Sequence, residues 1–151
     1  MKTVKRRIFT SIIACFMACM MFAMPVLAST TSSSYFSKTT TKLNAVNGGQ
    51  SSISSVTSGS VPDGAYVTSV KVFCNVARGT DPYTLYIKSP EGTIASYSGP
   101  MSSTTFTTHD FDGENPKGTW KVWIVNSGVS YNGNIIPTST VTVSLTVYYD
   151  Y

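Results

Sequence analysis

Apolar residues recur at every second position through most of the region from residue 61 to the C-terminus. A period of two places successive side chains on opposite faces of a strand, so each such run predicts one buried face. No run has the spacing of an amphipathic helix. Many short strands separated by turn residues predict an all-β fold, an antiparallel β-sandwich or jelly roll. The predicted core stripes are Val70, Val72, Cys74 and Val76; Tyr83, Leu85 and Ile87; Trp120, Val122 and Ile124; and Val141, Val143, Leu145, Val147 and Tyr149.

Residues 113–120 combine a turn with the start of a strand. Proline and glycine at the second and fourth positions of Asn115-Pro116-Lys117-Gly118 predict a type I turn. Trp120 then opens an alternating run, and we expect it to anchor the core. Shorter strands are expected at residues 93–97 and 103–108, with turns at 90–92, 99–100 and 132–134.

The first 28 residues have the pattern of a secretory signal peptide. A basic head precedes an apolar run that extends from Ile8 to Leu27, and small residues lead to a cleavage site after Ala28. Because the apolar run is longer than the ~7–15 residues that are usual for such a leader, an uncleaved N-terminal anchor is the alternative. We therefore expect a secreted, extracellular protein that contacts a membrane only through this leader, if the leader is retained.

Removal of the leader changes the charge of the chain. The full sequence has a formal net charge of +4, and the leader holds four basic residues and no acidic one. The remaining chain is therefore close to neutral, which argues against nucleic acid or an anionic membrane as a partner. Cys15 and Cys19 also leave with the leader. Mature Cys74 then has no intramolecular disulfide partner, and the core alone must stabilise the fold.

Residues 29–60 are dominated by serine and threonine and contain few apolar residues. Such a segment buries too little apolar surface to offset the entropy of ordering it, so we expect a linker or a loosely ordered segment. The alternative is a first edge strand that uses Leu43, Val46, Ile53 and Val56. Residues 61–151 are expected to form one domain, which is long enough to fold without disulfides.

Three motifs in this domain resemble the P domain (P/Homo B domain), the β-sandwich that follows the catalytic domain in proprotein convertases and many bacterial subtilisin-like proteases. Residues 61–64 (Val-Pro-Asp-Gly) resemble the family's opening Ile-Pro-Asp element. Residues 89–93 (Ser-Pro-Glu-Gly-Thr) resemble its Ser-Pro-x-Gly-Thr hairpin, and residues 113–120 resemble its Gly-Glu-x-x-x-Gly-Thr-Trp element. The resemblance covers about residues 61–147. It implies structural roles for Pro62, Asp63, Pro90, Gly92, Gly113, Gly118 and Trp120.

The resemblance also implies a role. A stand-alone P-domain-like sandwich would be a secreted, non-catalytic binding or structural module that interacts with a protease or another extracellular protein. One alternative is an adhesive module that binds a cell surface or a glycan. A cryptic hydrolase is the remaining alternative.

An acidic loop precedes the Trp120 strand. Asp110, Asp112 and Glu114 alternate around Gly113, so three carboxylates could converge on a hard cation, and calcium is the cofactor that such oxygen ligands would hold. The alternative is a solvated acidic turn in which Glu114 accepts hydrogen bonds from backbone N–H groups. No other cofactor is expected.

Cys74, His109 and Asn126 supply the residue types of a cysteine hydrolase. Cys74 lies on the same stripe as Val72 and Val76, where a thiol behaves as a small buried hydrophobe rather than a reactive thiolate. A single histidine does not build a typical zinc site, and no Gly-x-Ser-x-Gly element is present. We therefore expect a protein that is not an enzyme.

Four aromatic residues fall opposite the core stripes. Phe73, Tyr86, Trp123 and Tyr148 should point outward if the alternation holds. Grouped on one exposed face, they would suit glycan stacking or a protein partner. The alternatives are that residues 29–60 cover some of them, or that the four side chains belong to two different sheets.

Overall fold

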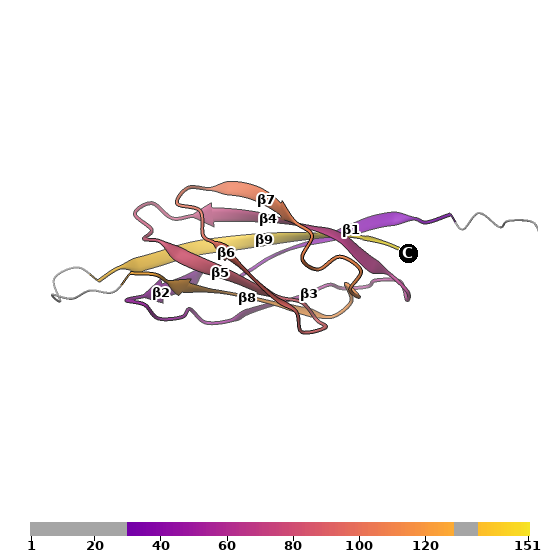
Figure 1. Ribbon diagram of the computed structural model, residues 1–151, viewed down its shortest axis with the longest axis horizontal. Helices are drawn as coiled ribbons and strands as arrows, with labels where there is room; N and C mark the ends of the chain where they lie inside the picture. Colours follow the sequence, from indigo (N-terminus) through magenta and orange to yellow (C-terminus); the bar gives the residue numbers. More distant parts are fainter. Residues whose placement is uncertain (1–29, 129–135) are drawn as a thin grey trace, which may run out of the picture. The chain divides into compact units, whose positions relative to one another are not determined.

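The computed structural model of the protein describes residues 30–128 and 136–151. Within them the chain forms β-strands and no helix, arranged as two antiparallel sheets packed face to face, which confirms the predicted β-sandwich (Figure 1). No helix in this part of the chain has the length and apolar character needed to cross a membrane. The strands are β1 (Ser33–Thr39), β2 (Leu43–Val46), β3 (Ser54–Thr57), β4 (Tyr66–Val76), β5 (Tyr83–Lys88), β6 (Ile94–Ser98), β7 (Thr104–Thr108), β8 (Thr119–Asn126) and β9 (Thr138–Asp150).

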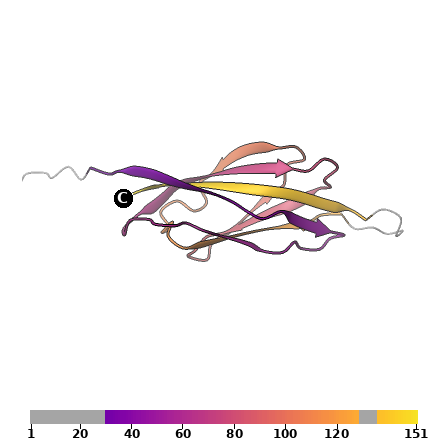
Figure 2. The ribbon, with the colours of Figure 1, turned by 180° about the vertical axis from the view of Figure 1, so that it is seen from behind.

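Sheet A is built around β9, the longest strand, with the order β1-β9-β4-β7. Strands β1 and β2 follow one another along the same edge of β9, as Figure 2 shows from behind. Strand β4 pairs with the other edge of β9 over ten residue pairs, with one irregularity between Val67 and Ser69. The outer edge of β4 pairs with β7.

Sheet B has the order β3-β8-β5-β6. Its two central strands, β8 and β5, pair in register from Tyr83 opposite Asn126 to Lys88 opposite Lys121. Each therefore has a neighbour on both sides, β3 beside β8 and β6 beside β5.

The core lies between the sheets and contains the predicted stripes. All of the predicted stripe residues are buried except Val76, which is half-buried and packs against the core. Phe111 is fully buried although it lies in the loop between β7 and β8, where no alternation signals burial. The shorter strands expected near residues 93–97 and 103–108 are β6 and β7.

The expectation of a linker at residues 29–60 is wrong for the described part of that segment. It forms β1, β2 and β3, and the compact unit begins at Thr31 rather than at residue 61. Leu43, Ala45 and Val56 are buried. Pairing with β9 and β8 supplies the ordering energy that composition alone does not reveal, because a serine-rich strand needs only alternate apolar residues to cover one side of a core.

The type I turn predicted at residues 115–118 is also wrong in detail. The Asn115 side-chain oxygen accepts a hydrogen bond from the Lys117 backbone N–H (2.9 Å), and the Gly118 N–H donates to the Ser58 hydroxyl (3.0 Å). The Asn115 side chain thus closes a turn with the backbone two residues on, as asparagine often does. The Gly118 N–H bonds to Ser58 instead of the Asn115 carbonyl that a type I turn would use. The signal peptide and the turn at residues 132–134 lie outside the described residues.

Candidate functional site

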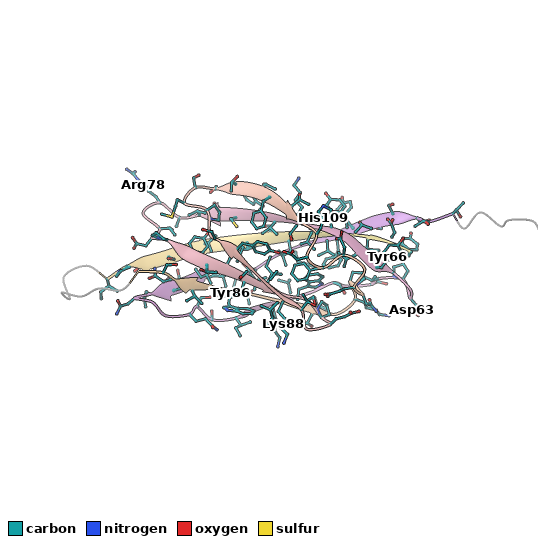
Figure 3. All side chains as sticks on the ribbon, in the orientation of Figure 1. Asp63, Tyr66, Arg78, Tyr86, Lys88 and His109 are labelled. Carbon is teal, nitrogen blue, oxygen red and sulfur yellow. The ribbon has the colours of Figure 1, made fainter. Side chains whose placement is uncertain are left out.

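The three sequence motifs, residues 61–64, 89–93 and 113–120, meet in one cluster, which we name the motif joint. The Lys117 ammonium contacts the Asp63 carboxylate (2.9 Å), joining the third motif to the first. The Asn115 N–H donates to the Glu91 carboxylate (2.8 Å), joining the third motif to the second. All three motifs thus serve a single local structure, and Asp63 is labelled in Figure 3.

The motif joint ties the two sheets together. Gly118 directly precedes β8 and exchanges backbone and side-chain hydrogen bonds with Ser58, which follows β3. On the other side, the Gly113 N–H donates to the Val67 carbonyl and the Val67 N–H donates to the Glu114 carbonyl, both at 2.8 Å, which anchors the loop to β4. These contacts give residues 113–118 a structural role, because they connect β4 of sheet A to the β3–β8 side of sheet B.

Trp120 connects the motif joint to the hydrophobic core. Its ring is fully buried and meets Phe111 edge to face at 5.2 Å between centroids. Its indole N–H donates to the Pro116 carbonyl (3.2 Å), so its polar atom is satisfied inside the core. The third motif requires glycine at position 118, because the φ there is +134° and a Cβ would lie 2.9 Å from the Cβ of Pro90.

The acidic loop does not gather its carboxylates. Asp110 accepts hydrogen bonds from the Tyr97 hydroxyl (2.6 Å) and the Thr108 hydroxyl (2.8 Å), which lower its pKa. Asp112 binds His109 (2.8 Å). In the described part of the chain, no three Asp, Glu, His or Cys side chains are placed to share a metal ion, so the convergence predicted for Asp110, Asp112 and Glu114 is not found.

The hydrolase residue types are also separated. Cys74 is fully buried, and that burial raises the pKa of its thiol to about 11, so the thiolate is disfavoured. His109 is exposed and its Nδ1 lies 3.2 Å from the carbonyl of Thr68, six residues before Cys74 on β4. Six residues of strand span about 20 Å, far beyond hydrogen-bond reach. Asn126 is committed instead to the Ser139 hydroxyl (2.7 Å).

The four outward aromatic residues divide between the sheets, so the single aromatic face is wrong. Phe73 and Tyr148 lie on sheet A, on β4 and β9, whereas Tyr86 and Trp123 lie on sheet B, on β5 and β8. The structure adds partners that sequence reasoning missed. Tyr148 packs against Tyr35 of β1, with ring centroids 5.7 Å apart.

Three tyrosines occupy the outer face of sheet A near the C-terminal end of β9. Tyr35 lies opposite Tyr148, and Tyr66 lies opposite Asp150, two residues further along β9. Tyr35 is 62% exposed and Tyr66 is 42% exposed. We name Tyr35, Tyr66 and Tyr148 the tyrosine patch. Around it, cross-strand hydroxyl pairs such as Ser37 with Thr146 (3.0 Å) share the face with two charged residues, Asp150 opposite Tyr66 and Lys71 opposite Thr146.

The outer face of sheet B carries a different group. The Tyr86 and Trp123 rings stack with centroids 5.3 Å apart and 3° between their planes. Lys88 and Lys121 stand directly opposite each other two residues along the same strands. We name these four residues the lysine–aromatic face; Tyr86 and Lys88 are labelled in Figure 3. Alternation predicts that each lysine shares a face with its aromatic neighbour, but only the strand register brings the two lysines together.

No family profile matches the sequence, and no curated protein matches it either. Among solved structures, the fold resembles the crystal structure of FLHE, with a TM-score of 0.54 and 16% identity over 79% of this chain and 96% of that chain. It also resembles the serine protease of Aeromonas sobria, with a TM-score of 0.55 and 14% identity over 85% of this chain.

A third match is the crystal structure of the Aeromonas sobria serine protease in complex with the chaperone ORF2, with a TM-score of 0.55, 15% identity and 78% of this chain covered. In the two Aeromonas matches the chain spans 28% and 27% of the chain that it resembles. At these identities the likeness shows a shared β-sandwich fold. A module of this shape therefore occurs both in FLHE, which it nearly fills, and within larger protease structures.

Proposed function

We propose that this protein is a secreted, non-catalytic binding module, similar to a P domain, that docks onto an extracellular protein, with subtilisin-like serine proteases as the foremost partner class. The motif joint supports the P-domain assignment, because the three family-like motifs serve one structural cluster. The fold likeness to part of a serine protease supports the partner class. The leader-like pattern of residues 1–28 supports secretion.

The tyrosine patch is the observation that carries the docking proposal. Tyr35 and Tyr66 expose broad, rigid rings that lose little conformational entropy when a partner covers them, and tyrosine is enriched at protein interfaces for that reason. The surrounding hydroxyl groups are neutral and already paired across strands, as between Thr39 and Ser144 (2.8 Å). A partner would thus meet mostly uncharged groups on this face, with Asp150 and Lys71 as the charged residues that β9 and β4 contribute to it.

The arrangement of the possible catalytic groups supports a non-catalytic role. A nucleophile needs a base within hydrogen-bond reach and access to substrate. Cys74 is sealed in the core, whereas His109 is exposed and held by Asp112. The role proposed for this protein is therefore binding through surface residues, not catalysis by Cys74 and His109.

Site-specific photo-crosslinking in the full chain tests the proposal. A photoreactive phenylalanine analogue replaces Tyr66 in one variant and Met101, an exposed residue of the loop between β6 and β7, in a matched control. Each is exposed to the culture medium and cell envelope of the producing organism, and crosslinked proteins are identified by mass spectrometry. We expect one extracellular protein, a serine protease in the foremost case, to crosslink at position 66 and not at position 101.

The captured protein is then titrated with the Tyr35→Ser/Tyr66→Ser variant. Loss of two interface tyrosines should weaken binding at least about tenfold, since each buried aromatic anchor contributes on the order of 1 kcal/mol or more. Equal crosslinking from positions 66 and 101, or no crosslinked protein from either, would contradict docking through the tyrosine patch.

A further inference from the structure

The outer face of sheet B carries positive charge without any negative charge. Its outward positions follow from the alternation of buried and exposed residues on the four strands. Two of these positions are lysines and none is an aspartate or glutamate. The outward residues are Ser55 and Thr57 on β3, Thr119, Lys121, Trp123 and Val125 on β8, Thr84, Tyr86 and Lys88 on β5, and Ile94, Ser96 and Ser98 on β6.

The two lysines are placed unfavourably for the isolated protein. Lys88 and Lys121 face each other across β5 and β8, and like charges directly opposite one another destabilise a sheet. Within residues 30–128 and 136–151, the ion pairs are those of His109 with Asp112 and of Lys117 with Asp63, so neither Lys88 nor Lys121 has an acidic partner. An anionic ligand would relieve this repulsion.

The aromatic pair lies beside the lysines on the same two strands. Tyr86 and Trp123 stand opposite each other, two residues from Lys88 and Lys121, which is about 7 Å along the strands. Both residues are half-buried, and the facing sides of their rings stack on each other. Cations and aromatic surfaces thus alternate over a short distance on one face.

The position of this group within the sheet decides how a ligand can bind. Strands β5 and β8 are paired on both sides, so their backbone groups are not free to add an extended peptide strand. Recognition must come from side chains that stand on the face. Ser55, beside Lys121, and Ser96, beside Tyr86, add exposed hydroxyl groups that can exchange hydrogen bonds with a hydroxylated ligand.

We propose that the lysine–aromatic face binds a carboxylated polysaccharide. The ammonium groups of Lys88 and Lys121 pair with sugar carboxylates, which are spaced along such a polymer. The rings of Tyr86 and Trp123 pack against sugar C–H groups, whose partial positive charge suits the negative face of an aromatic ring. The serine hydroxyls bind sugar hydroxyls. This inference is independent of docking through the tyrosine patch, which lies on the other sheet.

Affinity electrophoresis of the full chain in gels that contain polygalacturonate tests the inference. We expect retardation in polygalacturonate, weakened by added salt, and none in neutral dextran. The Lys88→Gln/Lys121→Gln variant should lose at least about tenfold in affinity, and Trp123→Ala should lose a similar amount, because charge and stacking each contribute. Lys71→Gln, which removes an exposed lysine from the outer face of sheet A, is the matched control and should change affinity less than about twofold.

Three results would overturn the inference. The first is no retardation in polygalacturonate. The second is equal loss of affinity in Lys71→Gln and in the double variant, which would show attraction to charge anywhere on the surface. The third is equal binding to polyglutamate, which would assign the face to acidic polypeptides. Thermal unfolding of each variant verifies that it is folded. Crosslinking at position 66 tests the tyrosine patch alone, so the two proposals can fail independently.

Discussion

Trp120 and Trp123 lie three residues apart on β8 and point to opposite sides of sheet B. Trp120 is sealed in the core, where Phe111 and the Pro116 carbonyl fix its ring. Trp123 lies on the outer face and stacks on Tyr86. The same residue type thus holds the fold together at one position and is available to a ligand at the other, and the difference arises only from strand alternation.

The regions around the two tryptophans differ in the same way. The motif joint around Trp120 consists of residues that bond to one another, such as Asp63 with Lys117. The lysine–aromatic face around Trp123 contains two cations with no acidic partner among the described residues. Substitutions in the motif joint should therefore change stability, and those on the lysine–aromatic face should change binding.

The largest effect is expected from Trp120→Ala. Removal of a fully buried indole leaves a cavity and an unpaired Pro116 carbonyl, at a cost of about 3–5 kcal/mol in the free energy of unfolding. Equilibrium unfolding in urea measures the change, with a variant that fails to fold counting as the extreme case. A loss below about 1 kcal/mol would contradict the anchoring role.

Gly118→Ala comes next. The glycine φ of +134° is strained for alanine, and the added Cβ would meet Pro90 at 2.9 Å, so we expect a loss of about 1–3 kcal/mol. Gly79→Ala is the matched control, since Gly79 also has a positive φ, +77°, but no atom lies within 4 Å of its Cβ position. Both losses are measured by urea unfolding. Equal losses would show that the positive φ, and not the close contact with Pro90, causes the destabilisation.

Lys88→Gln/Lys121→Gln should change stability in the opposite direction. Replacing two opposed cations by neutral side chains should raise the free energy of unfolding by a few tenths of a kcal/mol at low salt, because repulsion across the strands is removed. Added salt should erase the gain. Thermal unfolding at low and high salt provides the measurement, and a variant less stable than the parent at both would mean that the lysines support the fold.

The smallest effect concerns His109 and Asp112 on the loop between β7 and β8. The hydrogen bond and charge of Asp112 raise the pKa of His109 above its ordinary value. Their contribution to stability is therefore complete below about pH 6.5, the ordinary histidine pKa, and is lost as the pH rises through the raised pKa. The parent Tm should fall slightly over that range, and the Tm of His109→Gln should not. Identical profiles would contradict the pairing.

The sequence predicted the sandwich because alternation reports directly which side of a strand is buried, as at Val143 and Leu145. It offered a first edge strand in residues 29–60 only as the alternative to a linker and did not predict the three strands β1–β3, because their energy comes from pairing with strands more than 60 residues away in the chain, such as Ser54 with Val122. The burial of Phe111 was not predicted for a related reason, since loop residues have no periodicity that signals burial.

The candidate sites were harder to predict than the fold. Alternation correctly placed Tyr86 and Trp123 outward, yet the register that opposes Lys88 to Lys121 depends on long-range pairing. The three acidic residues looked convergent because spacing alone does not show that Tyr97 and His109 engage two of them separately. Sequence thus indicates which side chains are available, and pairing decides which of them meet.

Trp123→Ala, measured for unfolding and for binding in the same preparation, tests the division between the motif joint and the lysine–aromatic face most directly. We predict a loss of about 1–3 kcal/mol in the free energy of unfolding, because the half-buried ring loses its stacking on Tyr86 and part of its burial, together with loss of polygalacturonate retention. Destabilisation as large as that of Trp120→Ala, or full retention of binding, would contradict the account.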